Sequence, residues 1–495
     1  MKQLLSPSLV KQSLSSHSWL GIAMGAMLYL VCLSGSIAVF YPEFERWEQP
    51  RVEPVSAVSG DLAQRAYDAL VAQTAQVDAD ATDDGDHHHH RYVLMPTEDN
   101  PRLVVADDEQ GWFVNADGTL GEKVAHDWTH VLTDLHLYLH LPTSFGMIVV
   151  SILGAMLCGL IISGFLSHPR IFKDAFALRL KASPRLQQAD VHNRLSVWGA
   201  PFYLTIAITG AFFGLANLFG YVAANAFYDG DLGEVIPAIY GAEPELDQPP
   251  QAAQVGRALA QMHSIAPEAT PLYITIEGID SPEQFIMVGA THPGRLIYAE
   301  QYRFDSAGSY MDKVGFSDGD AGRQAIFSVY RIHFGHFGGE WVQWVYALLG
   351  LALTVISVSG INIWLSKRKK RDALNNLWTG IVWGTPVGLS ASALASIGFG
   401  ITSIGIFWGA ILLAMVWAQI VDSHPHAKRR LQAACALLLA ATAIAHVVVF
   451  GQYALSGTAL GVNISLLVLA LAFALTVIKS ARTRHQHTSE IVQAT

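Results

Sequence analysis

Eight long apolar stretches divide this chain, and each is close to the length that crosses a membrane. A transmembrane helix needs about 20 mostly apolar residues. The stretches cover residues 19–40, 144–166, 195–219, 341–365, 378–396, 401–421, 431–450 and 460–478. This pattern predicts a polytopic all-α membrane bundle of about eight spans.

Two long polar connections separate the early spans, and both have the pattern of a small α+β domain. The first predicts a helix at 62–73, strands at 91–95 and 102–106, and a hairpin-type turn at 115–118. The second predicts a helix at 252–262, strands at 272–277, 284–288 and 296–299, and a turn at 304–309. A helix followed by short strands, twice, indicates an internal repeat of span, domain and span.

Basic residues gather in alternate connections, and this predicts the orientation. They lie before the first span, between the second and third, after the fourth, between the sixth and seventh, and after the eighth. Lysine and arginine mark cytoplasmic loops. We therefore expect both termini in the cytoplasm and the two long connections, at about 41–133 and 220–324, outside, in a periplasm if the cell is Gram-negative.

Composition agrees with a membrane protein, since 51% of residues are hydrophobic and only 15% are charged, whereas soluble domains carry about 25% charge. A formal net charge of −10 argues against nucleic acid as a partner. The first apolar stretch has no small-residue cleavage site after it, so we interpret it as a signal anchor rather than a removed leader.

Four of the spans begin at or near a histidine, on alternating sides of the predicted membrane. His17 and His192 stand at the inner side, and His136 and His333 stand at the outer side. Low-spin haem iron takes two axial ligands, and neutral imidazole suits it. The pattern therefore predicts an inner haem held by His17 and His192 and an outer haem held by His136 and His333.

Other histidines compete for these roles. His140 lies one helical turn after His136, and His336 follows His333 by three residues, so these two could be the outer ligands. His168 ends the second span on the inner side and could replace His17 or His192. Interfacial histidines without a ligand are also common, and only the four-fold recurrence favours the haem interpretation.

Cationic side chains near these histidines could pair with haem propionates. Arg194 and Arg170 are candidates inside, although the positive-inside bias is a slightly better explanation of both, and Arg331 is the candidate outside. An acidic and histidine-rich run at 83–90 could bind a metal ion, but a solvated loop is the more frequent explanation.

Several motifs follow one another in a fixed order along the chain. They are His17-x-Trp-Leu-Gly with Ser34-Gly35, Leu135-His-x-x-Leu-His-Leu-Pro142, Ser163-Gly164, Asp190-x-His-Asn193 with Thr209-Gly210, and His333-Phe-Gly with Ser359-Gly360. Over about residues 10–370 this order resembles the PepSY-associated transmembrane family, which includes bacterial inner-membrane ferric-siderophore reductases. Small residues in these pairs let helices, or a flat macrocycle, approach closely. Relatives often have a histidine where this chain has Tyr203, so Tyr203 is excluded as an iron ligand.

The resemblance implies a fold and a domain organisation. We expect a helical membrane bundle with two α+β PepSY-like periplasmic domains, divided into six segments. They are 1–40 (first span), 41–133 (first periplasmic domain), 134–219 (second and third spans), 220–324 (second periplasmic domain), 325–371 (fourth span) and 372–495 (an extension with four more spans).

It also implies a function, namely a ferric-siderophore reductase of the bacterial inner membrane with two haem b groups, surrounded by membrane lipid. Flavin and nucleotide motifs are absent, so a separate cytoplasmic flavoprotein or a quinol must donate the electrons. Two alternatives stay open: a transporter of the siderophore or its iron, favoured by the four additional spans, and a non-catalytic PepSY-type regulator of an envelope protein.

Overall fold

The computed structural model describes residues 6–78, 90–168, 170–176, 179, 183–316, 319–401 and 403–494. Within these residues the chain divides into two compact units, and each is described by itself. The helical unit comprises 1–50, 126–215 and 338–495, and the sheet unit comprises 51–125 and 216–337.

In the described part of the chain, eight helices are long and apolar enough to cross a membrane, which confirms the predicted multi-pass architecture. They are α1 (Pro7–Ala38), α5 (Thr143–Ser167), α7 (Pro184–Phe227), α11 (Gly339–Lys367), α12 (Ala373–Phe399), α13 (Ile404–Val421), α14 (His424–Phe450) and α15 (Gly457–Ala494). Their N-terminal and C-terminal limits differ from the apolar stretches because polar turns extend several helices beyond them.

Short helices precede or connect the spans of the helical unit. They are α2 (Tyr41–Glu48), α4 (Asp127–Tyr138), α6 (Ile171–Asp174) and the 3-10 helix η1 (Gly451–Leu455). The candidate ligand His136 therefore lies on α4, a separate helix that ends before α5 begins, and not on the span itself. Leu139 and His140 adopt left-handed backbone conformations, each with φ of 56°, where α4 ends.

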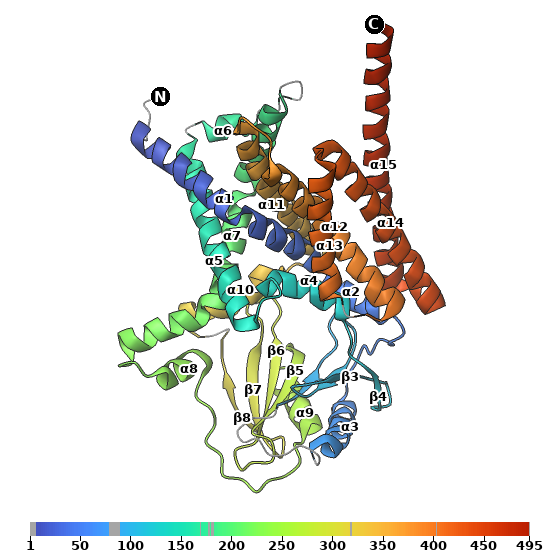
Figure 1. Ribbon diagram of the computed structural model, residues 1–495. Coiled ribbons are helices and arrows are strands. Elements are labelled where there is room, and N and C mark those ends of the chain that lie inside the picture. The colour runs from blue at the N-terminus through green and yellow to red at the C-terminus, as the bar shows by residue number, and fades with distance from the viewer. Residues whose placement is uncertain are drawn as a thin grey trace. The chain divides into compact units, whose positions relative to one another are not determined.

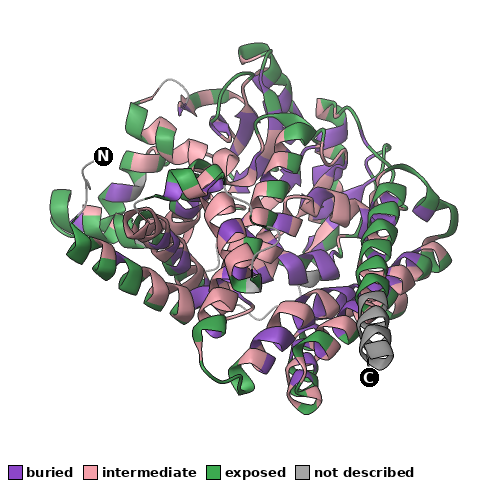
Figure 2. Ribbon diagram, turned by 90° about the horizontal axis from the view of Figure 1, so that it is seen from above, coloured by how far each residue is buried: buried purple, intermediate pink, exposed green. Residues whose placement is uncertain are grey.

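Helix α1 packs against α11, α5 and α4, while α12 packs against α13 and α14, and α14 against α15. Figure 2 shows that buried and exposed positions alternate along the helices, so each span turns one side toward its neighbours. Large apolar side chains such as Leu413, Ile420, Leu437 and Val448 are exposed. In water such a surface would be unfavourable, so it is the side expected to face lipid.

The sheet unit is built on one antiparallel sheet of eight strands in the order β4-β3-β2-β1-β5-β6-β7-β8. Its strands are β1 (Arg91–Leu94), β2 (Val104–Ala106), β3 (Gly111–Val114), β4 (Leu120–Lys123), β5 (Thr270–Glu277), β6 (Phe285–Thr291), β7 (Glu300–Asp305) and β8 (Tyr310–Val314). Helices α3 (Gly60–Asp78) and α9 (Val255–Ile265) lie together against it and share its apolar core (Figure 1). Two further helices, α8 (Leu232–Tyr240) and α10 (Ala321–Phe334), belong to the same unit.

The two repeats of helix and strands are joined through their first strands. Strand β1 pairs antiparallel with β5, with Val93 opposite Ile274. The two segments that the sequence pattern treats as separate domains thus contribute to one sheet and one core. Each four-stranded meander alone would leave its first strand as an exposed edge, and pairing these edges removes both.

The predicted strand at 296–299 is wrong, because the strand of that region begins at Glu300. Backbone groups in the preceding segment bond elsewhere. The Tyr298 N–H donates to the Phe327 carbonyl, and Arg331 donates to the carbonyls of Arg295 and Ile297. These bonds to α10 take the place of a sheet ladder.

Candidate functional site: two histidines facing across a cavity

His17 is held on α1 by a group of backbone and side-chain atoms from α5. Its Nδ1 lies 3.0 Å from the Leu160 carbonyl oxygen and 3.3 Å from Ser163 Oγ. A carbonyl only accepts, so Nδ1 carries the proton and Nε2 carries the lone pair. Gly164 completes the arrangement, since a Cβ there would lie 3.3 Å from His17 Cε1.

His192 on α7 is held by α11 in the same way. Its Nδ1 lies 3.2 Å from the Ile356 carbonyl oxygen and 3.1 Å from Ser359 Oγ. A Cβ on Gly360 would lie 3.3 Å from His192 Cε1. Carbonyl, hydroxyl and glycine at positions i, i+3 and i+4 of one helix therefore form a seat for a histidine of another helix. We call this arrangement a histidine seat.

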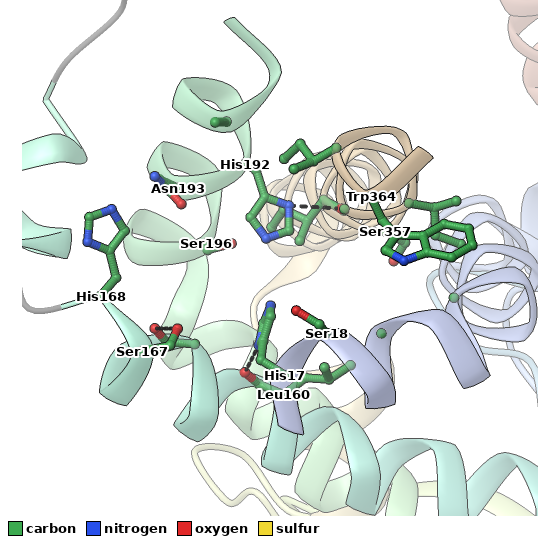
Figure 3. Close-up of a pocket in the computed structure, with 18 of the residues that line it drawn as sticks. His17, Ser18, Leu160, Ser167, His168, His192, Asn193, Ser196, Ser357 and Trp364 are labelled. Carbon is green, nitrogen blue, oxygen red and sulfur yellow. Dashed lines mark hydrogen bonds between the residues drawn. The ribbon is translucent and has the colours of Figure 1, made fainter. Parts of the chain in front are cut away.

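The rings of His17 and His192 face one another, with centroids 6.3 Å apart and planes at 86° (Figure 3). Metal–imidazole bonds of about 2.0 Å on opposite sides of one ion place two ring centroids roughly 6 Å apart. Within the described part of the chain, no protein group is hydrogen-bonded to Nε2 of either ring. The pair therefore fits two axial ligands of one metal ion, oriented by their Nδ1 bonds.

A cavity of about 660 Å³ surrounds the pair. Most of its lining is apolar, with residues of α1, α5, α7 and α11. Two cationic side chains, Arg185 and Lys367, also line it, and no aspartate or glutamate is among the described lining residues. Such a cavity suits a large apolar ligand with anionic groups at one edge, and the substituents of a haem meet that description.

The residues predicted from the sequence for these supporting roles lie elsewhere in the structure or only at the edge of the site. The Arg194 guanidinium donates to the carbonyls of Ala175 and Phe176, so it anchors the segment around α6 and does not line the cavity. His168 lines the rim of the cavity with Nε2 3.4 Å from Asp174, and Figure 3 shows it apart from the facing pair. Arg170 is exposed.

Sequence reasoning missed Arg185 and Lys367 because they belong to basic clusters that the positive-inside bias already explains. Other cations of the same clusters have acidic partners: Arg179 pairs with Asp190, and Arg368 pairs with Asp372. Only the structure separates the two cations that line the cavity from those that bind carboxylates.

Tyr203 also lines this cavity. Its side chain is 2% exposed, and its buried hydroxyl has no hydrogen-bond partner among the described residues. The ring lies over Gly199, where a Cβ would come within 2.1 Å of it. This tyrosine therefore fills the space that the absence of a side chain at Gly199 provides.

A third histidine seat holds His136. Its Nδ1 lies 2.9 Å from the Val31 carbonyl oxygen, and a Cβ on Gly35 would lie 2.4 Å from His136 Cε1. Ser34 occupies the hydroxyl position of this seat, with its Oγ bonded to the carbonyls of Leu30 and Val31. Burial lowers the pKa of His136, which favours the neutral imidazole that metal binding requires.

His140, the rival of His136, uses both ring nitrogens in protein contacts. Its Nε2 lies 2.8 Å from the Val131 carbonyl oxygen and therefore donates. Its Nδ1 accepts from Trp408 Nε1 at 3.0 Å. Because neither nitrogen is left for a metal ion, this geometry favours His136 as the ligand on α4.

The remaining outer candidates lie in the sheet unit, and the pairing of His333 with His136 stays a prediction from the sequence. His333 is on the last turn of α10, and His336 follows the helix. Arg331 is engaged by the carbonyls of Arg295, Ile297 and His336. Burial lowers the pKa of His336.

The histidine run is only partly within the described residues, because 87–89 lie outside them. His90 is described. Its backbone N–H donates to Asp108, and its Nε2 lies 3.0 Å from Glu277 Oε2. In the described part of the chain no group of three potential metal ligands is present, so this site stays a sequence hypothesis.

The helical bundle of candidate membrane spans, the histidine seats within it and the α+β sheet unit together describe a multi-pass membrane protein with an additional domain. Residues 14–367 match the PepSY-associated TM region family, and the chain belongs to that family. An uncharacterized protein of Pseudomonas aeruginosa is 24% identical over 314 residues, which cover 58% of this chain and 77% of the relative. Residues after 367 lie outside the family match.

Proposed function

We propose that this protein is a di-haem b electron-transfer protein of a bacterial inner membrane that reduces ferric-siderophore chelates. The observation that carries the proposal is the pair of His17 and His192, whose rings face one another 6.3 Å apart across a cavity. When bound, haem supplies an iron that changes between its ferrous and ferric states. Residues of this chain bind the haem, orient its ligands and neutralise its charge.

The residues around the inner cavity hold and neutralise such a group. Leu160 and Ile356 fix the two imidazoles through their carbonyls, so the Nε2 lone pairs are presented to the cavity. Arg185 and Lys367 offer positive charge to propionates, and the apolar walls offer contact to a macrocycle. A largely apolar site with two cations favours a bound anionic macrocycle.

The second haem b is proposed at His136. Its seat on α1 repeats the geometry of the two inner histidines. His333 is its proposed partner, on the evidence of the sequence repeat. With haem held by His17 and His192 and by His136 and His333, the two groups would supply redox centres between a cytoplasmic flavoprotein or quinol as donor and the acceptor.

The proposed acceptor is a ferric chelate on the periplasmic side. A hard-oxygen ligand set prefers the more highly charged ferric ion, so one-electron reduction weakens the chelate and releases Fe(II). The sheet unit has a cavity of about 470 Å³, whose lining includes the uncharged Tyr240, Phe285 and Gln301 and the charged Glu243, Glu277 and Arg303. The aromatic and amide groups are the ones proposed to contact the organic part of such a chelate.

The purified full-length protein tests the proposal through its absorbance spectrum and its haem-to-protein ratio. We expect a b-type spectrum with two haems per chain, and the His192→Ala variant should lose one of them. His263→Ala is the matched control, because His263 bonds to Leu259 within its own helix in the sheet unit. A protein without haem absorbance after expression with ample haem would refute the proposal.

A further inference from the structure

Two of the helices after the family match, α12 and α13, contact α4 or the residues that follow it directly. Trp408 of α13 donates from Nε1 to His140 Nδ1 at 3.0 Å, and its ring lies edge-on to the imidazole with centroids 5.9 Å apart. His140 in turn donates to Val131 within α4. This chain of bonds fixes the C-terminal turn of α4, one turn after His136.

The backbone of that turn needs such support. Leu139 and His140 both have φ of 56°, a left-handed conformation that side chains other than glycine rarely adopt. Residues in such conformations persist where the surrounding structure determines them strongly. The Trp408 and Val131 bonds to the His140 ring provide that determination.

The N-terminal turn of α4 is also tied to the added helices. Trp128 donates from Nε1 to the Leu389 carbonyl of α12 at 3.0 Å. Glu48 of α2 caps α4, with its carboxylate oxygens 2.8 Å from Trp128 N and 2.9 Å from Thr129 N. Both ends of α4 are therefore held from outside the helix.

Helix α2 is itself fixed by α14 and α15. His446 donates from Nε2 to the Trp47 carbonyl at 2.7 Å, and the two rings stack with centroids 4.8 Å apart. Trp47 Nε1 donates to Asn463 Oδ1 at 3.0 Å. Trp47, His446 and Asn463 are all buried. The capping carboxylate of Glu48 thus follows directly after a residue held by two of the additional spans.

We propose that α12–α15 are a support that positions α4, and that Trp408 is the positioning residue that keeps His136 in its seat on α1. Residues beyond 367 are outside the family match, so the support is added by this chain's extension. The inference rests on the proposed function only where its test measures haem. The placement of α4 itself can be tested without haem.

The decisive variant is Trp408→Phe in the full-length protein, because phenylalanine keeps an aromatic ring and removes the N–H donor to His140. Trp417→Phe is the matched control on the same helix α13, since Trp417 is partly exposed and lies beside Arg430. Hydrogen exchange should be severalfold faster for amides 131–141 in Trp408→Phe, with those of α5 unchanged. Unchanged exchange at 131–141 would overturn the support of α4.

The reduction potentials of the haems distinguish a positioning role of Trp408 from a contribution to general stability. In Trp408→Phe we expect one of two reduction waves to shift while the other keeps its potential. A lower melting temperature with both waves unchanged would show a merely structural contact and overturn the positioning role. A wild-type protein without haem contradicts the proposed function instead, and hydrogen exchange then decides the support alone.

If Trp408→Phe does not accumulate, Trp47→Phe takes its place. This change removes the donor to Asn463 and loosens α2, so faster exchange is expected at the N-terminal turn of α4, at amides 128–131. No change there would equally contradict the proposed support. Tyr453→Phe, at a partly exposed tyrosine of η1, is the control for this second variant.

Discussion

Gly35 of α1 lies directly under the ring of His136, and a Cβ at Gly35 would come within 2.4 Å of Cε1 and 2.6 Å of Nδ1. Atoms cannot approach that closely, so any side chain at this position moves the imidazole. The contact explains why the sequence places glycine immediately after Ser34 in this span. The same pairing of serine and glycine seats His17 and His192.

The first prediction concerns this contact. Gly35→Ala should displace His136, destabilise the protein by about 1–3 kcal/mol through overpacking, and remove one haem if the proposed function holds. Thermal unfolding and the haem-to-protein ratio measure the two effects. Gly159→Ala is the control, because among the described residues the contact of a Cβ there is an ordinary one, with Leu20 at 3.8 Å. Equal melting temperatures and haem-to-protein ratios in the two variants would contradict the proposed role of Gly35 in seating His136.

Two tyrosines of the bundle should respond differently to loss of the hydroxyl. Tyr29 donates to the Val382 carbonyl at 2.7 Å, so Tyr29→Phe should cost about 1 kcal/mol. The buried Tyr203 hydroxyl has no partner in the described part of the chain, so Tyr203→Phe should leave stability unchanged or raise it by up to about 1 kcal/mol. Chemical denaturation of both variants checks the pair. A marked loss in Tyr203→Phe would show that the hydroxyl has a partner in the folded protein.

Arg185 and Lys367 should make binding of an anionic macrocycle depend on salt. Both are exposed cations, so each contributes at most about 1 kcal/mol, and together they contribute less at high ionic strength. The double variant Arg185→Gln/Lys367→Gln should release haem faster in a transfer assay at low salt. Lys369→Gln, at an exposed position outside the cavity lining, is the control. A rate of haem release equal to that of wild type would show that neither cation contributes to binding.

Glu48 should make stability fall between mildly acidic and neutral pH. Burial raises the pKa of Glu48 to about 7, against the opposing bonds from Trp128 and Thr129. Its folded pKa lies above the unfolded value, so the folded protein binds more protons, and its stability decreases as pH rises from about 4.5 through 7. The shift corresponds to roughly 3 kcal/mol at most.

Melting temperatures at pH 5 and pH 8 test this dependence. The wild type should lose stability between the two values, and Glu48→Gln should lose less because glutamine cannot ionise. Asp127, which adds to the raised pKa of Glu48, offers the control Asp127→Asn, which should keep most of the pH slope. If the melting temperature changes with pH to the same extent in Glu48→Gln and wild type, groups other than Glu48 cause the pH dependence.

The spans and most strands were predictable from the sequence because both depend on local patterns. Long apolar stretches determine membrane helices, and alternation determined strands such as β5 and β6. The segment 296–299 has the same alternation but is not a strand, because its backbone bonds to Arg331 and Phe327. The local pattern of residues cannot predict hydrogen bonds to partners that lie so far along the chain.

The candidate site was predictable in its residue types and not in its contacts. The sequence identified His17, His192 and the serine–glycine pairs as separate motifs. It could not show that each pair seats a histidine, because the partners are more than 100 residues apart. The choice between His136 and His140 likewise depends on Trp408, 268 residues from His140.

The ladder between β1 and β5 has a consequence for how the protein is made. Residues 91–94 emerge during synthesis long before 270–277, and the spans α5 and α7 must be inserted in the interval. Until then, the first meander presents an open strand edge, which is prone to wrong pairing. Both halves of the sheet must also reach the same side of the membrane, and the two intervening spans return the chain to that side. A single sheet therefore links correct insertion of two helices to the completion of a soluble fold.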